Sequence, residues 1–135
     1  LKTAFELRKN PNVNSIYLNG VFKSRQGRDK NEVDIIAELG SRLLFIECKT
    51  RITNPTDIDK FRSVVRNSSG TSSIALFVTN DRVKQDLAHE VEEKCRDNRI
   101  LTWNFSAWRD AKEHDCVYPS LKELVDSQIN IQNPR

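Results

Sequence analysis

The sequence predicts one α/β domain built on a mixed sheet. Two short apolar runs joined at Gly40-Ser41 have the pattern of a tight hairpin. Residues 73–79 are nearly all apolar, which is typical of a strand covered on both faces. Stretches with helical spacing lie between and after the strands, and this alternation indicates right-handed strand–helix–strand crossovers. The expected order is therefore α-β-β-β-α-β-α-β-α, followed by a further helical piece.

The composition excludes several classes of protein. The chain has 135 residues, 37% apolar and 30% charged, which is typical of a globular domain and excludes disordered and fibrous chains. It contains no apolar run near the roughly 20 residues that span a bilayer and no secretory signal, so we expect a cytoplasmic protein without a membrane partner. The net charge of +3 permits a nucleic-acid partner without indicating one. The absence of methionine suggests a domain cut from a longer chain.

The three cysteines, Cys48, Cys95 and Cys116, have no metal-finger spacing. An odd number of thiols in a cytosolic protein favours reduced side chains over disulfides. We therefore expect the fold to be held together without covalent cross-links.

The segments before the hairpin are short. Residues 1–9 have helical spacing, which Pro11 ends because it lacks a backbone donor. A strand is expected over 15–22, with a bulge or bend at Asn19-Gly20. The polar and basic stretch that follows, residues 23–31, predicts a loop.

Two amphipathic helices are expected beyond the hairpin. The first begins in residues 53–56 and ends in residues 67–70, with apolar residues on one stripe and its basic residues Lys60, Arg62 and Arg66 elsewhere on the surface. The second is capped by Asn80 or Asp81 and runs to about Asp97. Their inward residues are expected to be Ile58, Phe61, Val64 and Val65 for the first helix, and Val83, Leu87, Ala88, Val91 and Cys95 for the second.

The end of the chain is predicted to hold a fifth strand over 100–103 and helices over 105–112 and 121–129. The last six or so residues read as a frayed tail. The aromatic residues Trp103, Phe105 and Trp108 are interpreted as core, with base stacking as the alternative. Neither His89 nor His114 has a partner at nucleophile or zinc spacing, so both are expected on the surface.

The hairpin over Asn31–Arg51 carries the unusual charges. With Gly40-Ser41 as a two-residue turn of type II′, Leu39 pairs with Arg42. The same register places Asp34 opposite Glu47 and Glu32 opposite Lys49. Side chains directly opposite on antiparallel strands are about 5 Å apart, and like charges there destabilise the sheet. A divalent cation between the two carboxylates would remove that conflict.

Strand parity adds a third group to this pair. Glu47 and Lys49 share one face, while Cys48 points to the other, toward a covering helix. Carboxylates are the ligands that Mg²⁺ prefers, and a lysine can stabilise negative charge developing on phosphorus or orient an attacking water. The alternative is that these are charged strand ends in solvent, with Asp34 paired to a nearby Arg or Lys.

The segment NEVDIIAELGSRLLFIECKT, followed by the lysine-bearing helix DIDKF, resembles the motif of the PD-(D/E)xK nuclease superfamily. It is most similar to the nuclease domains that follow CARF sensor domains in cyclic-oligoadenylate-activated CRISPR ancillary nucleases. Archaeal Holliday-junction resolvases share a looser pattern. The resemblance covers residues 31–80 and implies a restriction-endonuclease-like αβββαβ core flanked by helices, with extra C-terminal helices.

The resemblance also implies an activity and a site. It implies a phosphodiesterase dependent on Mg²⁺ or Mn²⁺, with Asp34 and Glu47 as metal ligands and Lys49 as the catalytic lysine. The backbone carbonyl of Cys48 is a further candidate ligand, and Glu6 is the candidate acid on the first helix.

Other residues have two interpretations each. Glu32 is an extra ligand or an ion-pair partner of Lys49, and Lys60 contacts the cleaved strand or is simply solvated. A set of basic residues is interpreted either as phosphate contacts or as solvated charge. It consists of Lys23, Arg25, Arg28, Lys30 and Arg51.

The function predicted from the sequence is a metal-dependent endonuclease acting on DNA or RNA. The resemblance further implies a homodimer, a sensor domain upstream in the same polypeptide, and a role in CRISPR or other antiviral defence. The rival hypotheses are a catalytically inactive nucleic-acid-binding or dimerisation module on the same fold, and a nuclease of the Holliday-junction-resolvase or restriction type.

Overall fold

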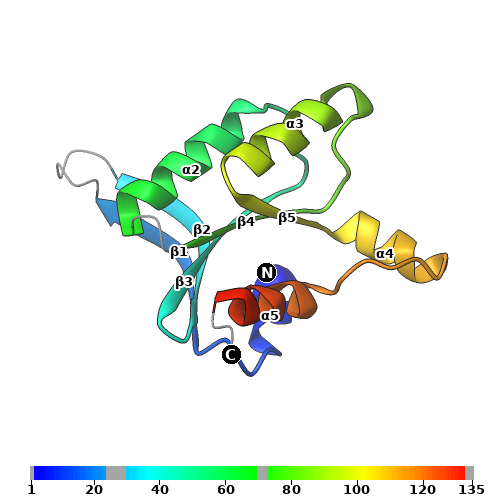
Figure 1. Ribbon diagram of the computed structural model, residues 1–135. Helices are drawn as coiled ribbons and strands as arrows, with labels where there is room; N and C mark the ends of the chain where they lie inside the picture. The colour runs from blue at the N-terminus through cyan, green and yellow to red at the C-terminus, as the bar shows by residue number, and fades with distance from the viewer. Residues whose placement is uncertain (1, 24–29, 70–72, 133–135) are drawn as a thin grey trace.

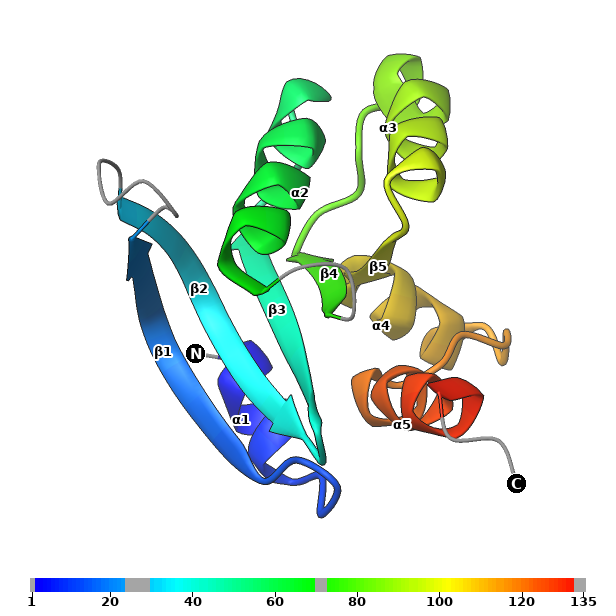
Figure 2. The same ribbon diagram turned by 60° about the vertical axis from the view of Figure 1, so that its left-hand side comes forward.

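A computed structural model of the chain shows three layers (Figures 1 and 2). It describes residues 2–23, 30–69 and 73–132, the side chains of 19–23, 30–32, 68–69 and 129–132 excepted. A mixed five-stranded sheet forms the middle layer of the described chain. Two helices cover one face and two cover the other, so the predicted α/β class is confirmed.

The strands follow one another across the sheet in chain order. The first three form the expected antiparallel meander, and the last two run parallel to the third. The strands are β1 (Ser15–Lys23), β2 (Lys30–Leu39), β3 (Arg42–Lys49), β4 (Ile74–Thr79) and β5 (Ile100–Asn104).

The helices occupy the positions that the sequence predicts, with some shifted boundaries. In the described residues α2 and α3 pack on one face of the sheet and α1 and α5 on the other, while α4 follows directly from β5. The helices are α1 (Lys2–Arg8), α2 (Thr56–Ser69), α3 (Gln85–Asp97), α4 (Phe105–Glu113) and α5 (Leu121–Gln132).

The β2–β3 hairpin has the predicted turn and register. Gly40 has a φ of 63°, whereas Ser41 is not in the left-handed region, as a type II′ turn requires. Leu39 pairs with Arg42, and the same register continues to Ile35 opposite Ile46. The turn therefore fixes which side chains of β2 and β3 share a face.

Two local predictions are wrong. The bulge that was one of the two interpretations of Asn19-Gly20 is absent, because the pairs on either side of this step, Leu18–Ile35 and Gly20–Val33, keep the same register. The third helix begins at Gln85 rather than at Asn80 or Asp81. The backbone N–H groups of Asn80 and Asp81 instead donate to the carbonyls of Lys49 and Thr50, which holds this segment against the end of β3.

The core has one cluster on each side of the sheet. Trp103 is fully buried and donates from Nε1 to the Pro119 carbonyl at 2.9 Å, and Phe105 packs edge-on against it. This confirms the core interpretation of both residues, and the partly buried Trp108 adjoins them. The predicted stripe of α2 is also confirmed, with Ile58, Phe61 and Val65 buried and Val64 at its edge.

Two side chains lie elsewhere than predicted. Ala88 is exposed on α3 although the helical spacing placed it inward. Arg62 was expected on the surface of α2, but only 7% of it is exposed. It is adjacent in sequence to Phe61 and lies three residues before Val65, so its stem falls at the edge of the buried stripe.

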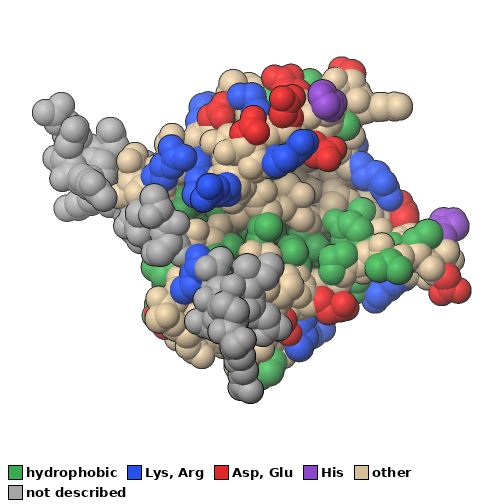
Figure 3. All heavy atoms as spheres, viewed as in Figure 1, with side chains coloured by type: hydrophobic (Ala, Val, Ile, Leu, Met, Phe, Trp, Pro, Cys, Tyr) green, Lys and Arg blue, Asp and Glu red, His purple; other side chains and the backbone are tan. Residues whose placement is uncertain are grey.

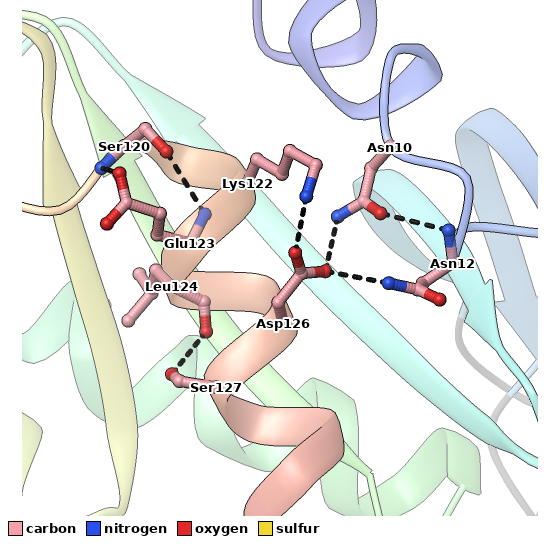
Figure 4. A network of polar contacts seen from close by, with 8 residues as sticks. All are labelled: Asn10, Asn12, Ser120, Lys122, Glu123, Leu124, Asp126 and Ser127. Carbon is pink, nitrogen blue, oxygen red and sulfur yellow. Dashed lines mark hydrogen bonds and ion pairs between the residues drawn. The ribbon is translucent and has the colours of Figure 1, made fainter.

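The α5 helix is fastened to the segment between α1 and β1 by one carboxylate (Figure 4). Asp126 accepts hydrogen bonds from the side-chain amides of Asn10 and Asn12 at 3.0 and 3.1 Å, and from Lys122 at 2.7 Å. Although burial acts to raise the pKa of Asp126, these donors hold it below its usual value. The carboxylate therefore ties the two ends of the described chain together.

The state of the cysteines and the length of the helices bear on two expectations from composition. Cys48, Cys95 and Cys116 are free thiols, as predicted. No helix within the described ranges is long and apolar enough to cross a membrane.

The turn makes a testable prediction about stability. No atom lies within 4 Å of a Cβ added at Gly40, so replacing it with alanine strains only the backbone. Gly40→Ala should lower the free energy of unfolding by about 1 kcal/mol, because a left-handed conformation disfavours any Cβ. Ser41→Ala is the matched control and should change it by less than about 0.5 kcal/mol in urea unfolding. Equal effects of the two substitutions would contradict the assigned turn.

Candidate active site at the end of β3

The candidate site lies where β2 and β3 separate. Their pairing runs from the hairpin to Ile35–Ile46, whereas β3 continues to pair with β4 as far as Lys49–Thr79. Figure 2 shows β2 diverging from β3 with distance from the hairpin. The last residues of β3 thus lie beside an opening in the sheet. In sheets with parallel strands, the carboxyl ends of the strands are a common place for ligands.

Asp34 bridges this opening. Its Oδ2 atom accepts a hydrogen bond of 2.9 Å from the backbone N–H of Cys48. A side-chain carboxylate from β2 thereby satisfies a donor of β3 beyond the last paired residues of the two strands. The carboxylate of Asp34 is consequently held beside that of Glu47.

The environment of Glu47 disfavours its charge. Burial contributes most, followed by a hydrogen bond and charge repulsion from Asp34, and together they raise its pKa to about 8. The positive charge of Lys49 opposes this effect, and the negative charge of Asp57 adds to it. At neutral pH Glu47 therefore keeps its proton, because a second ionised carboxylate beside Asp34 is disfavoured.

Lys49 extends from the same face of β3 toward α2. Its Nζ donates to Oδ2 of Asp57 at 3.1 Å, and both side chains are partly buried. Asp57 lies in the first turn of α2. The side chain of Asn54 caps the start of this helix by accepting a hydrogen bond of 3.1 Å from the Thr56 N–H.

Asp57 is a residue of the site that the sequence reasoning missed. The available signal was topological, because the helix that follows a parallel strand begins near the carboxyl end of that strand. An acidic residue in the first turn of such a helix is therefore placed beside the side chains that end the strand.

Cys48 points to the opposite face, as strand parity predicts. Its Sγ lies 3.7 Å from Oγ1 of Thr3 on α1. Burial contributes most to raising the pKa of this thiol. The first helix thus brings Thr3 to the end of β3, whereas Glu6 forms an ion pair of 3.4 Å with Lys9 on the same helix.

The remaining predicted residues fall into three groups. Arg51 donates from Nε to the Arg82 carbonyl at 2.8 Å and lies 3.9 Å from Asp81, so it braces the loop after β3. Lys60 is exposed on α2, three residues beyond Asp57. Five predicted side chains lie outside the described part of the structure: Lys23, Arg25, Arg28, Lys30 and Glu32.

The donor set of Asp34 and Glu47 suits a hard divalent cation. Mg²⁺ commonly binds one or two carboxylates and retains water for its other positions. When Glu47 is ionised, it lies with Asp34 and Asp57 near the single ammonium group of Lys49, which favours a further positive charge. Within the described residues no group of three or more His, Cys, Asp or Glu side chains could hold a metal, so Glu6 does not join this pair.

The fold and this pair define the chain as an α/β domain with a carboxylate site at the end of its central strand. The chain matches no family model and no curated protein sequence. Among solved structures it is similar to Can2 from Sulfobacillus thermosulfidooxidans, solved in complex with cyclic tetra-adenylate. The two share 20% identity and a TM-score of 0.61 over 76% of this chain.

Two further structures share the fold. Protein VC1899 from Vibrio cholerae is 22% identical with a TM-score of 0.63 over 84% of the chain. Protein AF1548, of unknown function, is 15% identical with a TM-score of 0.57 over 76%. The chain spans 29%, 30% and 55% of the lengths of Can2, VC1899 and AF1548 respectively. At these identities the likeness establishes the fold.

The raised pKa of Glu47 predicts how stability varies with pH. The folded chain retains a proton that the unfolded chain releases between about pH 4.5 and 8. The contribution of Glu47 to the free energy of unfolding is therefore fully present below this pH range and is lost as the pH rises through it. Glu47→Gln should raise the free energy of unfolding at pH 8.5 by about 1–3 kcal/mol, and by less at pH 5.

The matched control is Glu92→Gln, the same chemical change at an exposed position of α3. It should change stability by less than about 0.5 kcal/mol at both pH values. Urea unfolding at pH 5 and 8.5, without divalent ions, measures both variants. A Glu47→Gln chain that is less stable than the parent at pH 8.5 would show that Glu47 is not held in a repulsive environment.

Proposed function

We propose that this chain is the catalytic domain of a metal-dependent endonuclease that hydrolyses phosphodiester bonds of DNA or RNA. The observation that carries the proposal is the contact of Asp34 with both Glu47 and the Cys48 N–H at the carboxyl end of β3. A partly buried pair of acids with a lysine on the same face is chemistry suited to phosphoryl transfer. The resemblance of residues 31–80 to PD-(D/E)xK nucleases supports the same function.

In this proposal Asp34 and Glu47 hold Mg²⁺ or Mn²⁺, with the Cys48 carbonyl as a further ligand. The bound ion would polarise a phosphoryl oxygen and make its water more acidic. Glu47 must be ionised to bind a cation, so a metal ion competes with the proton that Glu47 carries near neutral pH. The partial burial of the pair lowers the local dielectric constant and strengthens its attraction for a cation.

Lys49 supplies the positive charge beside the reacting phosphate. Its ammonium donates to Asp57, which keeps the flexible side chain on the face that carries Glu47. From that position it stabilises negative charge that develops on the phosphoryl oxygens or orients the attacking water. Lys60, one turn along α2 from Asp57, is exposed and in this proposal contacts the cleaved strand.

We also propose a biological setting for the domain. The shared fold with Can2, a protein solved with a cyclic oligonucleotide, supports a role in CRISPR or antiviral defence. The chain spans less than a third of Can2, which is consistent with a nuclease domain joined to a sensor domain in one cytoplasmic polypeptide. A homodimer would present two such sites to the two strands of a duplex.

A second candidate function is a nucleic-acid-binding module without catalysis. The ion pair of Lys49 with Asp57 favours it, because this contact engages the ammonium group that the nuclease requires. In this case the domain would bind nucleic acid, and its pair of acids would serve folding or dimerisation.

Cleavage assays separate these two functions. Supercoiled plasmid, single-stranded DNA and single-stranded RNA should each be incubated with the chain in Mg²⁺ or Mn²⁺. We expect cleavage of at least one substrate, lost on addition of EDTA, with Asp34→Asn and Lys49→Ala at least about 100-fold slower. Lys84→Ala, which removes an exposed lysine before α3, is the matched control and should cleave as the parent does.

Two outcomes of these cleavage assays would contradict the proposed nuclease. Equal rates for the parent and the Asp34→Asn and Lys49→Ala variants would refute the assigned site. Nucleic acid that is bound but never cut by the parent in either metal would support the module without catalysis.

Metal binding can be tested without activity. Calorimetric titration with Mn²⁺ should show binding that Asp34→Asn and Glu47→Gln each weaken by at least about tenfold. The affinity should fall as the pH drops from 8 to 6, because a proton competes for Glu47. Asp86→Asn, on the exposed face of α3, should leave the affinity unchanged. Equal affinities in all four proteins would place the Mn²⁺ elsewhere.

A further inference from the structure

Arg62 is a charged side chain buried without a counter-ion among the described residues. Only 7% of the residue is exposed, and its Nε and Nη1 atoms have no hydrogen-bond partner in the part of the chain that the structure describes. A guanidinium group has five N–H donors and remains charged in proteins. Leaving such a group unpaired is among the most unfavourable arrangements in a protein interior. A nearby negative charge would therefore lower the cost of burying this group.

Arg62 is also one of the residues that line a groove of about 1040 Å³. The groove lies at the amino ends of the parallel strands, where Arg42 begins β3 and Ile74 begins β4. The ends of α2 and α3 close its sides and contribute Arg66 and Arg96, and Arg99 lies just beyond the end of α3. Ser41 and Ser73 add hydroxyl donors, and Asp97 is the single carboxylate along its described lining.

Positive charges converge on Arg62. Burial contributes most to lowering the pKa of its guanidinium, and the charges of Arg66 and Arg99 lower it further. Figure 3 shows Lys and Arg side chains gathered near α2 and α3 around a hollow of the surface. The charges of this groove are therefore mutually repulsive in the absence of an anion.

Arg99 has an unfavourable backbone conformation. Its φ is 55°, the left-handed conformation that follows many helices and that glycine adopts most readily. An arginine in this position is strained, yet the conformation directs the chain from α3 into β5 beside the groove.

The helix dipole accounts for part of this cluster only. Arg66 and Arg96 lie in the last turns of α2 and α3, where cations are stabilised by the dipole. Arg62 lies in the middle of α2, so the helix terminus explains neither its burial nor its unpaired donors. An anion in the groove would offset the repulsion between Arg62 and the neighbouring guanidinium groups.

We propose that the groove lined by Arg62, Arg66 and Arg99 is a binding site for adjacent phosphate groups. Guanidinium groups bind phosphate oxygens through paired, charge-assisted hydrogen bonds, and several of them favour a ligand with more than one phosphate. Such a ligand is either a small oligophosphate or consecutive phosphodiesters of a nucleic acid, which offer the same chemistry.

The site is separate from the carboxylate pair. Asp57 in the first turn of α2 faces Lys49, whereas Arg66 lies in the last turn of the same helix. The helix has 14 residues and is therefore about 20 Å long. Binding in the groove requires no divalent ion, so it does not depend on the proposed nuclease activity.

Thermal unfolding with and without phosphate probes tests the proposal. The chain is kept in EDTA and mixed with inorganic phosphate, pyrophosphate or a short single-stranded oligonucleotide. We expect pyrophosphate, the oligonucleotide or both to raise the Tm of the parent more than inorganic phosphate does. Response to pyrophosphate alone would identify a small oligophosphate, and response to the oligonucleotide would identify nucleic acid.

Three variants locate the binding. Arg62→Met, Arg66→Gln and Arg99→Gly should each weaken calorimetric binding of the effective probe by about tenfold or more. Without a probe, Arg62→Met and Arg99→Gly should be at least as stable as the parent, because each removes an unfavourable feature. Their weakened binding then cannot be ascribed to unfolding.

Two controls complete the experiment. Arg8→Gln removes the same charge from an exposed position of α1, on the other side of the sheet, and should bind as the parent does. Asp34→Asn should also bind normally, which separates this site from the nuclease site. The proposal is overturned if no probe stabilises the parent, or if the three groove variants and Arg8→Gln bind alike.

Discussion

The hydrogen bond from the Cys48 N–H to Asp34 is the contact on which the arrangement of the site depends. It supplies an acceptor to β3 beyond the point where its pairing with β2 stops, so that β2 can diverge without leaving a buried donor unsatisfied. The same bond fixes the Asp34 carboxylate beside Glu47, whose charge Lys49 favours. The Asp34 side chain thus satisfies the Cys48 N–H and, at the same time, disfavours the charge of Glu47.

The α2 helix connects the two charged regions of the molecule. Its first turn carries Asp57, which holds Lys49, and its later residues carry Arg62 and Arg66 toward the groove. This polarity agrees with the helix dipole, which favours acids at the start and bases at the end. Because α2 connects β3 to the parallel strand β4, it begins near the carboxyl end of β3 and ends near the amino end of β4. The same helix therefore contributes residues to both the carboxylate pair and the groove.

The sequence predicts the frame of this fold well, because its strongest signals are local. The Gly40-Ser41 turn determines the register of β2 and β3, and strand parity determines that Cys48 faces α1 while Lys49 faces α2. The start of α3 and the burial of Arg62 depend on tertiary contacts, namely the tether of Asn80 to β3 and the neighbours of α2. Asp57 was missed because its partner lies eight residues away on another element.

Glu47 and Arg62 share one physical property, although their charges are opposite. Each is an ionisable group whose surroundings disfavour its charged form, as the direction of each pKa shift shows. Apolar residues of similar size would cost the isolated domain less at either position, since buried charges rarely improve stability. A cation at the first position and an anion at the second would each convert repulsion into attraction. The two proposals thus give each group a ligand of opposite charge as its partner.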